Sequence, residues 1–218
     1  MANTAYLMWM SISSPLAINT FNTNTSTTSV CTNTVTAPAN CLLVVSTTQT
    51  NAITVAPNGA ITSVPSLTWT KQVKAGLAST GNAEIWTAPF AAGGSITTTA
   101  TWASGTGQSS SVLYVLVNQN ASPIGNFNSS SSVTSSPSVS ITTTGANSIL
   151  ICNDCDWNVN VGTRTYLDGA TEALNYNATG GENYHFYNIK PTIGSYTEGM
   201  SSPTGQNYGC CVLEIKSI

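Results

Sequence analysis

Short apolar runs separated by Gly, Pro, Asn and Ser recur along the whole chain, and no stretch shows a helical period with caps. The segment 95–102, SITTTATW, places Ile96 and every second residue after it on one face, which is typical of a half-buried strand. The segment 110–117, SSVLYVLV, is almost continuously apolar and predicts a central strand covered on both faces. The pattern therefore predicts an all-β protein.

The second part of the chain repeats the order of the first. The run PANCLLVVSTT at 38–48 returns as GANSILICNDC at 145–155, and further pairs follow in the same order, such as GQSSSVLYVLV and GQNYGCCVLEI. We therefore predict an internal duplication with halves 20–120 and 139–218. The remaining segment 1–19 is predicted to be an N-terminal arm or the first strand.

The segment 121–138, ASPIGNFNSSSSVTSSPS, has low complexity and is rich in turn residues. It is therefore predicted to be the loop that joins the halves. Two halves of about six strands can form one jelly-roll-like β-sandwich or two tandem Ig-like sandwiches. We prefer one sandwich over residues 20–218, because the halves begin and end without clean linker boundaries.

Composition supports the all-β prediction and excludes two classes of partner. Charged residues make up 6% of the 218 residues and the net charge is −3, against about 25% charged residues in ordinary globular domains. Thr, Ser and Asn dominate instead, which favours strands and turns over helices. The chain has no basic patch for phosphates and no apolar run of the roughly 18 residues that a membrane span needs. We expect no nucleic acid and no membrane as partner.

The N-terminal segment contains a short apolar patch at 6–10 with no basic residue ahead of it. The patch is too short for the apolar region of a signal peptide, so we interpret it as a strand or an anchoring arm. The weakly charged surface is nevertheless typical of extracellular proteins. A protein of a virus particle that is released by lysis would combine these two features.

Several motifs resemble a known kind of module. They are LTWTKQVKAG (67–76), GNAEIWTAPFAAGGSITTTATW (81–102), SSSVLYVLV (109–117) and SVSITTTGANSILICN (138–153). Together they resemble the Thr/Ser-rich jelly-roll or Ig-like β-sandwich module of phage structural proteins and bacterial secreted proteins, over residues 19–218. The resemblance implies a sandwich without catalytic machinery that serves adhesion, sugar contact or virion decoration. The cysteines depart from the usual pattern of the module.

The six cysteines are candidates for disulfides: Cys31, Cys41, Cys152, Cys155, Cys210 and Cys211. Cys31 and Cys41 flank the turn APAN on adjacent strands, which favours a local bridge, and the duplication favours a bridge from Cys152 to Cys210 inside the sandwich. Cys210 and Cys211 should point to opposite faces of one strand. An outward Cys211 or Cys155 would then be free to cross-link another subunit after assembly. The alternatives are buried reduced thiols or, for the C-x2-C pair, zinc.

Other candidate side chains give weaker signals. Asp154 and Asp156 could bind calcium through oxygen ligands, although a solvated turn is the simpler interpretation. His185 has no sequence motif of a nucleophile and an orienting acid, so we interpret it as a surface or half-buried strand residue. No pair of carboxylates is selected by spacing. We therefore expect no catalytic residue, no cofactor, no metal and no enzyme activity.

Five tryptophans raise the question of a binding surface. Trp69, Trp86 and Trp102 have strand spacing and are expected in the core. Trp157 in a loop-like stretch and Trp9 near the N-terminus are the candidates for an exposed contact, including stacking on a glycan.

These observations favour a non-enzymatic phage virion structural protein. It would decorate or reinforce the capsid, neck or tail through self-association as a homo-oligomer and through contact with the major structural protein. Its expected place is the virion surface, which becomes extracellular after lysis. The alternative is an extracellular carbohydrate-binding or adhesin module.

Overall fold

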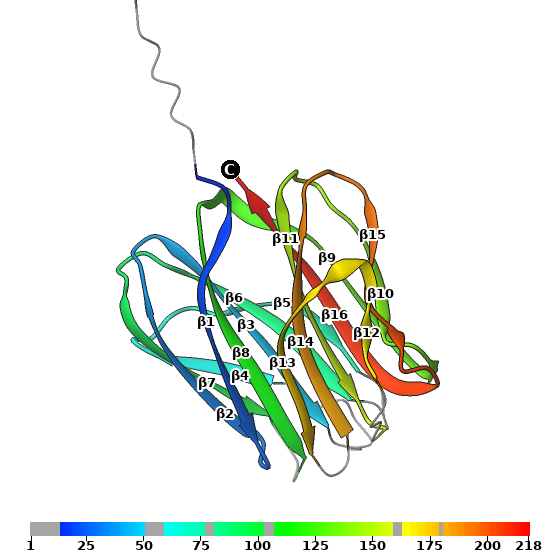
Figure 1. Ribbon diagram of the computed structural model, residues 1–218. Coiled ribbons are helices and arrows are strands. Elements are labelled where there is room, and N and C mark those ends of the chain that lie inside the picture. The colour runs from blue at the N-terminus through cyan, green and yellow to red at the C-terminus, as the bar shows by residue number, and fades with distance from the viewer. Residues whose placement is uncertain (1–13, 51–58, 77–80, 103–106, 159–162, 179–180) are drawn as a thin grey trace, which may run out of the picture.

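Figure 1 shows the computed structural model, which describes residues 14–50, 59–76, 81–102, 107–158, 163–178 and 181–218. All regular structure in these residues is β-strand, apart from one turn of 3-10 helix, η1 (Leu167–Gly169). The predicted all-β class is confirmed.

The first half of the chain forms two antiparallel sheets. The larger sheet has the order β1-β8-β3-β6-β5, with β1 (Ala17–Ser26), β8 (Gln108–Val117), β3 (Cys41–Thr50), β6 (Asn82–Phe90) and β5 (Thr70–Ala75). The smaller sheet has the order β2-β7-β4, with β2 (Val30–Ala37), β7 (Gly94–Trp102) and β4 (Gly59–Val64). Strands 1, 8, 3 and 6 thus lie in one sheet and 2, 7 and 4 in the other, which is jelly-roll order with β5 joined to the larger sheet.

The second half repeats this arrangement strand for strand. Its larger sheet has the order β9-β16-β11-β14-β13, with β9 (Gln119–Ser135), β16 (Gln206–Ser217), β11 (Ser148–Asp156), β14 (Gly181–Lys190) and β13 (Thr171–Ala178). Its smaller sheet has the order β10-β15-β12, with β10 (Ser138–Thr142), β15 (Ser195–Ser202) and β12 (Thr165–Tyr166). Each strand occupies the place that the strand eight positions earlier has in the first half. The topology therefore bears out the predicted duplication.

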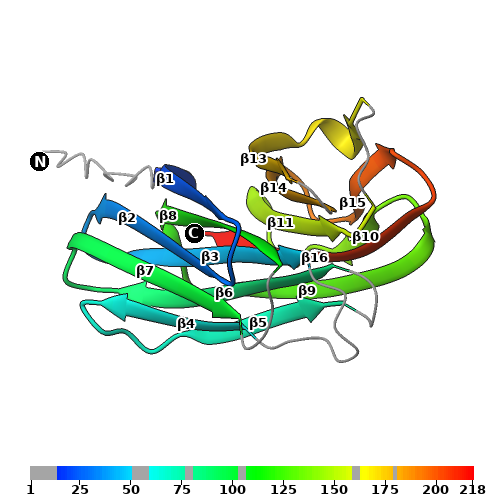
Figure 2. The same ribbon diagram turned by 90° about the horizontal axis from the view of Figure 1, so that it is seen from below.

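Each half closes a sandwich of its own. The single sandwich preferred from the sequence is therefore replaced by two tandem sandwiches, which have jelly-roll rather than Ig-like strand order. The two larger sheets pack face to face, with β3 against β11, β6 against β16, β5 against β9 and β1 against β13. Figure 2 shows the two sandwiches beside each other, with β7 and β4 on the outside of one and β10 and β15 in the other.

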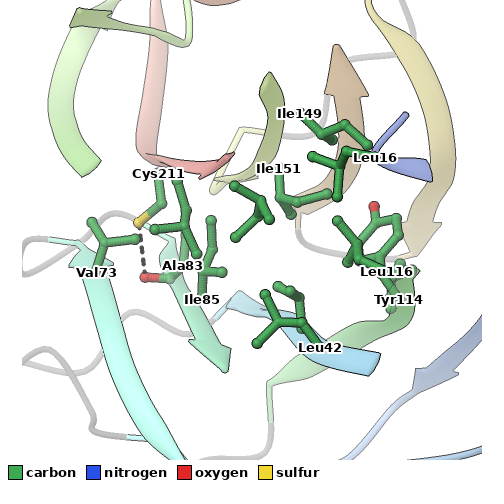
Figure 3. Packing of buried hydrophobic residues seen from close by; sticks show 14 of the residues in the cluster. Leu16, Leu42, Val73, Ala83, Ile85, Tyr114, Leu116, Ile149, Ile151 and Cys211 are labelled. Carbon is green, nitrogen blue, oxygen red and sulfur yellow. Dashed lines mark hydrogen bonds between the residues drawn. The ribbon is translucent and has the colours of Figure 1, made fainter. Parts of the chain in front are cut away.

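Three apolar clusters fill the spaces between the sheets. Leu43, Val45 and Ile96 belong to the core of the first sandwich, and Leu150, Phe186 and Met200 belong to the core of the second. The third cluster lies between the two larger sheets and is here called the central core; Figure 3 shows most of it. Its members include Leu42, Val44, Ile85, Tyr114, Ile149, Ile151, Cys211 and Leu213. Successive residues of one strand thus face different cores, which explains why β3, β8, β11 and β16 read as continuous apolar runs.

The segment 121–138, predicted as a loop, lies almost entirely in strand β9. β9 pairs antiparallel with β16, for instance Phe127 with Leu213. It is an edge strand without a buried side chain, so its Ser and Asn residues follow no apolar alternation and have the same composition as a turn-rich loop. The second half therefore begins with β9 rather than at residue 139.

The predicted N-terminal segment 1–19 divides at residue 14. Residues 1–13 lie outside the described part of the chain. Leu16 is buried in the central core, and β1 begins at Ala17. The end of this segment therefore belongs to the first sandwich.

Candidate functional site

All six cysteines fall within the described ranges and are buried free thiols. The predicted bridges, Cys31 to Cys41 and Cys152 to Cys210, are not formed in this structure. Cys152 and Cys210 do lie together in the core of the second sandwich, as the duplication predicted. Cys31 lies in the first sandwich instead, where its Sγ is 3.3 Å from Ser109 Oγ.

Cys210 and Cys211 face opposite sides of β16, as predicted, but both sides are interior. Cys210 lies in the core of the second sandwich and Cys211 in the central core, where its Sγ donates to Ala83 O at 3.3 Å (Figure 3). The expectation that Cys211 or Cys155 faces outward for cross-linking is wrong, because the sheet that carries them is covered on both faces. Burial raises the pKa of both thiols well above its usual value, which keeps them protonated and unreactive.

His185 is fully buried between the two sandwiches, which corrects the expectation of a surface or half-buried residue. Its Nδ1 lies 2.7 Å from Ser46 Oγ, and its Nε2 lies 2.8 Å from Ser110 Oγ and 3.3 Å from Thr48 Oγ1. Burial lowers the pKa of His185 to about 3, so the ring is neutral near neutral pH. The histidine therefore joins β14 of the second half to β3 and β8 of the first.

Asp154 and Asp156 lie on the face of β11 that points into the second sandwich, and Glu182 of β14 pairs with Asp156. Burial, reinforced by the neighbouring carboxyl groups, raises the pKa of Asp154 well above its usual value and that of Asp156 to about 7. Glu182 accepts a hydrogen bond of 2.6 Å from Asn177 Nδ2. In the part of the chain that the structure describes, no three His, Cys, Asp or Glu side chains are arranged to hold a metal ion.

Two other buried carboxylates are bound to structural donors. Glu84 accepts hydrogen bonds from Lys71 Nζ at 2.7 Å, Trp86 Nε1 at 2.9 Å and Gly59 N at 3.2 Å. These three donors lie on β5, β6 and β4, so Glu84 ties the two sheets of the first sandwich together.

Glu214 of β16 accepts more hydrogen bonds than Glu84. Its carboxylate accepts bonds of 2.8–3.0 Å from the backbone amides of Asn126, Thr144 and Gly145 and from the hydroxyls of Thr144 and Ser148. Burial opposes its ionisation, but these donors outweigh burial and lower the pKa of Glu214. The carboxylate therefore fixes β9 and the turn between β10 and β11 onto β16.

The accessible surface of the first sandwich is almost uncharged. No Asp, Glu, Lys or Arg occurs in residues 1–70 or 85–153, which include β1 to β4 and β7 to β10. On the outer face of the β2-β7-β4 sheet, threonine hydroxyls meet across the strands, at 3.3 Å for Thr32 with Thr99 and 2.9 Å for Thr34 with Thr97. This face offers a neutral array of hydroxyl and methyl groups.

Strands β1 and β9 are edges of the two larger sheets, and each has a single ladder partner among the described residues. Phe21 on β1 is 40% exposed and Phe127 on β9 is 53% exposed. Phe21 pairs with Tyr114 of β8 and Phe127 with Leu213 of β16, so the two rings hold corresponding places in the duplication. The motifs TFN at 20–22 and NFN at 126–128 carry this correspondence. Both lie among Thr, Asn and Ser residues without apolar alternation, so the hydrophobic pattern predicts no strand there.

A groove of about 370 Å³ runs beside the β9 edge. Its lining includes Asn126, Asn128, Ser140, Thr142 and Ser195. Asn126 Nδ2 donates to Thr142 O at 2.7 Å and Asn128 Nδ2 to Ser140 O at 2.8 Å, so the edge of β9 is joined to β10 through side chains.

The two tryptophans that were predicted to make exposed contacts, Trp157 and Trp9, do not form a binding surface within the described residues. Trp157 follows β11, is half-buried, and donates its backbone N–H to Asn207 O at 2.8 Å. Trp9 lies outside the described residues. Trp102 is 2% exposed, so its core prediction is confirmed, whereas Trp69 and Trp86 are half-buried and pack against the margin of the first sandwich's core.

Comparisons of the chain with protein-family models, with curated proteins and with solved structures found no match. The described residues include no helix with the length and apolar character to cross a membrane.

Proposed function

We propose that this chain is a non-enzymatic structural protein of a phage virion. It decorates or reinforces the capsid, neck or tail at the virion surface, as a homo-oligomer in contact with the major structural protein. The observation that carries the proposal is the pair of jelly-roll sandwiches packed face to face, because jelly rolls recur in viral capsid proteins.

The distribution of polar groups supports a passive role. The thiols, the histidine and the carboxylates Glu84, Asp154 and Glu214 are buried, and several of them are bound to structural partners. The surface of the first sandwich and the β9 edge carry almost no charge. Contacts through such a surface depend little on salt, and the absence of charge repulsion promotes association.

Purified particles test this proposal. We expect quantitative mass spectrometry of purified virions to find the chain in many copies per particle, and limited protease treatment of intact virions to cleave it at the surface. The soluble fraction of the same lysate is the control, in which the chain should be depleted. A chain confined to that soluble fraction would contradict the proposal.

The second candidate is an extracellular carbohydrate-binding or adhesin module. It is favoured by the groove beside β9, because amide and hydroxyl groups such as those of Asn128, Ser140 and Ser195 are the groups that bind sugars. Absence from virions together with a specific signal on a glycan array would favour this candidate over the first.

A further inference from the structure

We propose that copies of this chain associate edge to edge, with β1 of one copy pairing antiparallel with β9 of the next. The partner is a second copy, and the contact extends both larger sheets across the boundary between molecules. The inference deepens the self-association that the proposed virion function requires, and it rests on that function for its biological setting.

Among the described residues, each of the two edges lacks a second ladder partner and carries no charge, and the β9 edge is hydrogen-bonded to β10 only through the side-chain amides of Asn126 and Asn128. Natural edge strands are guarded against pairing by charges, prolines or bulges. The opposite edges of the same two sheets follow this rule, because β5 carries Lys71 and Lys74 and β13 carries Glu172. β1 and β9 differ from them in carrying no charge; their protection is limited to register irregularities in both strands and to Pro123 near the start of β9. Exposed edges of this kind accept an added strand through main-chain hydrogen bonds.

The internal duplication makes a second copy a fitting occupant. β1 and β9 hold the same place in their sheets and present the same succession of an exposed phenylalanine and an asparagine, Phe21-Asn22 and Phe127-Asn128. Both continue with short side chains, which carry hydroxyl or amide groups apart from Val133 on β9. Two neutral edges meet without repulsion, and aromatic pairs across neighbouring strands stabilise a sheet.

The position of the edges decides the form of the assembly. β1 packs beside β13 and β9 beside β5, so the two edges lie on opposite flanks of the molecule (Figures 1 and 2). Each copy then has one β1 edge and one β9 edge to offer. A contact between unlike edges is heterologous, so it continues from copy to copy as a row, or as a ring where the rotation closes.

Two single substitutions block one edge each. Thr25 on β1 and Ser129 on β9 are exposed, so Thr25→Lys and Ser129→Lys place a charge on one edge without touching a core. Thr101→Lys is the matched control, since Thr101 is exposed on β7, which has a neighbour on both sides. Sedimentation velocity over a concentration series should show wild type and Thr101→Lys growing beyond two chains.

The decisive step is mixing. Each blocked variant alone should stay a single chain, because it lacks one of the two edges. An equal mixture should form two-chain species and stop there, because only one β1 edge and one β9 edge remain to meet. That result also proves that both variants are folded.

Three outcomes would overturn the inference: wild type that stays a single chain, loss of association in Thr101→Lys, or dimers in either blocked variant alone. The last would mean that like edges pair. The virion function is tested by a different experiment, the mass spectrometry of purified virions. Rows that form in solution while the chain is absent from virions would leave the edge contact standing and refute the function.

Discussion

At the scale of single residues, buried polar side chains set how the two halves meet. His185 bonds to Ser46, Asn153 Nδ2 donates to Thr47 O at 3.2 Å, and Cys211 donates to Ala83 O, and in each case the partner lies in the other half. A buried polar group costs free energy when it is unpaired. These bonds therefore penalise any other placement of one sheet on the other.

His185 should make the protein sensitive to acid. Its pKa is about 3 in the folded chain and about 6.5 when unfolded, so between these values the unfolded chain binds more protons and stability falls as the pH falls. Above that window both states are neutral and the effect vanishes. His185→Gln keeps a hydrogen-bonding group but does not titrate. We expect the variant to gain about 2 kcal/mol relative to wild type between pH 7 and about pH 5, measured by urea unfolding.

The quantity to compare is the difference in the free energy of unfolding between wild type and His185→Gln at each pH. The raised pKa of Asp156 gives stability the opposite slope, lost as the pH rises through the window from about 4 to about 7. That contribution is common to wild type and variant and cancels in the difference. Parallel curves for the two proteins would show that the titration of His185 is not linked to folding.

Single residues were predicted well where the strand pattern alone decides burial. The core placement of Trp102 followed from its position in an alternating strand. The burial of His185 could not be predicted in this way, because its partners Ser46, Thr48 and Ser110 lie in the other half. The local sequence around His185 contains no sign of these contacts. The same holds for Cys155 and Cys211, because the larger sheet that covers their strands belongs to the other half and no local pattern places it there.

At the scale of elements, β9 is the strand that the pattern missed. An edge strand with exposed sides has no apolar period to detect, and its Ser and Asn residues are also typical of turns. A faint signal existed in the repeat itself. Ser-Pro-Leu at 14–16 returns as Ser-Pro-Ile at 122–124, and Leu16 and Ile124 both pack into or against the central core. The upstream part of the repeat therefore carries a sequence signal for this strand.

β9 depends on a close approach at Gly125. A methyl group at this position would collide with the carboxylate of Glu214, which holds β9 and the turn before β11. We expect Gly125→Ala to lower the free energy of unfolding by about 2–3 kcal/mol, since hydrogen bonds to a buried charge would be lost. Urea denaturation measures the change.

Gly194→Ala is the matched control for this substitution. The space beside Gly194 allows ordinary contact at 3.5 Å from Tyr196, so a methyl group fits there. The control should stay within about 0.5 kcal/mol of wild type. Equal effects of the two substitutions would show that the Glu214 contact is not what makes a glycine necessary at 125.

At the scale of the whole molecule, the two halves pack as the subunits of a twofold dimer would. β1 contacts β13, which is the counterpart of β5, and β9, the counterpart of β1, contacts β5. Such reciprocal contacts define an isologous interface. The sequence predicted the duplication but not this packing, because a continuously apolar strand fits the middle of one sandwich and the boundary between two equally well.

This packing predicts that the two sandwiches unfold together. The central core takes Ile85 from the first half and Ile151 from the second (Figure 3), so either sandwich alone would expose the apolar inner face of its larger sheet. Ile85→Ala should lower the free energy of unfolding by about 2–5 kcal/mol. Hydrogen exchange followed by mass spectrometry should show that loss equally in peptides from β3 and from β11. A loss confined to β3 would mean that the halves are independent units that merely touch, and a polar substitution at Ile85 would then leave the second sandwich intact.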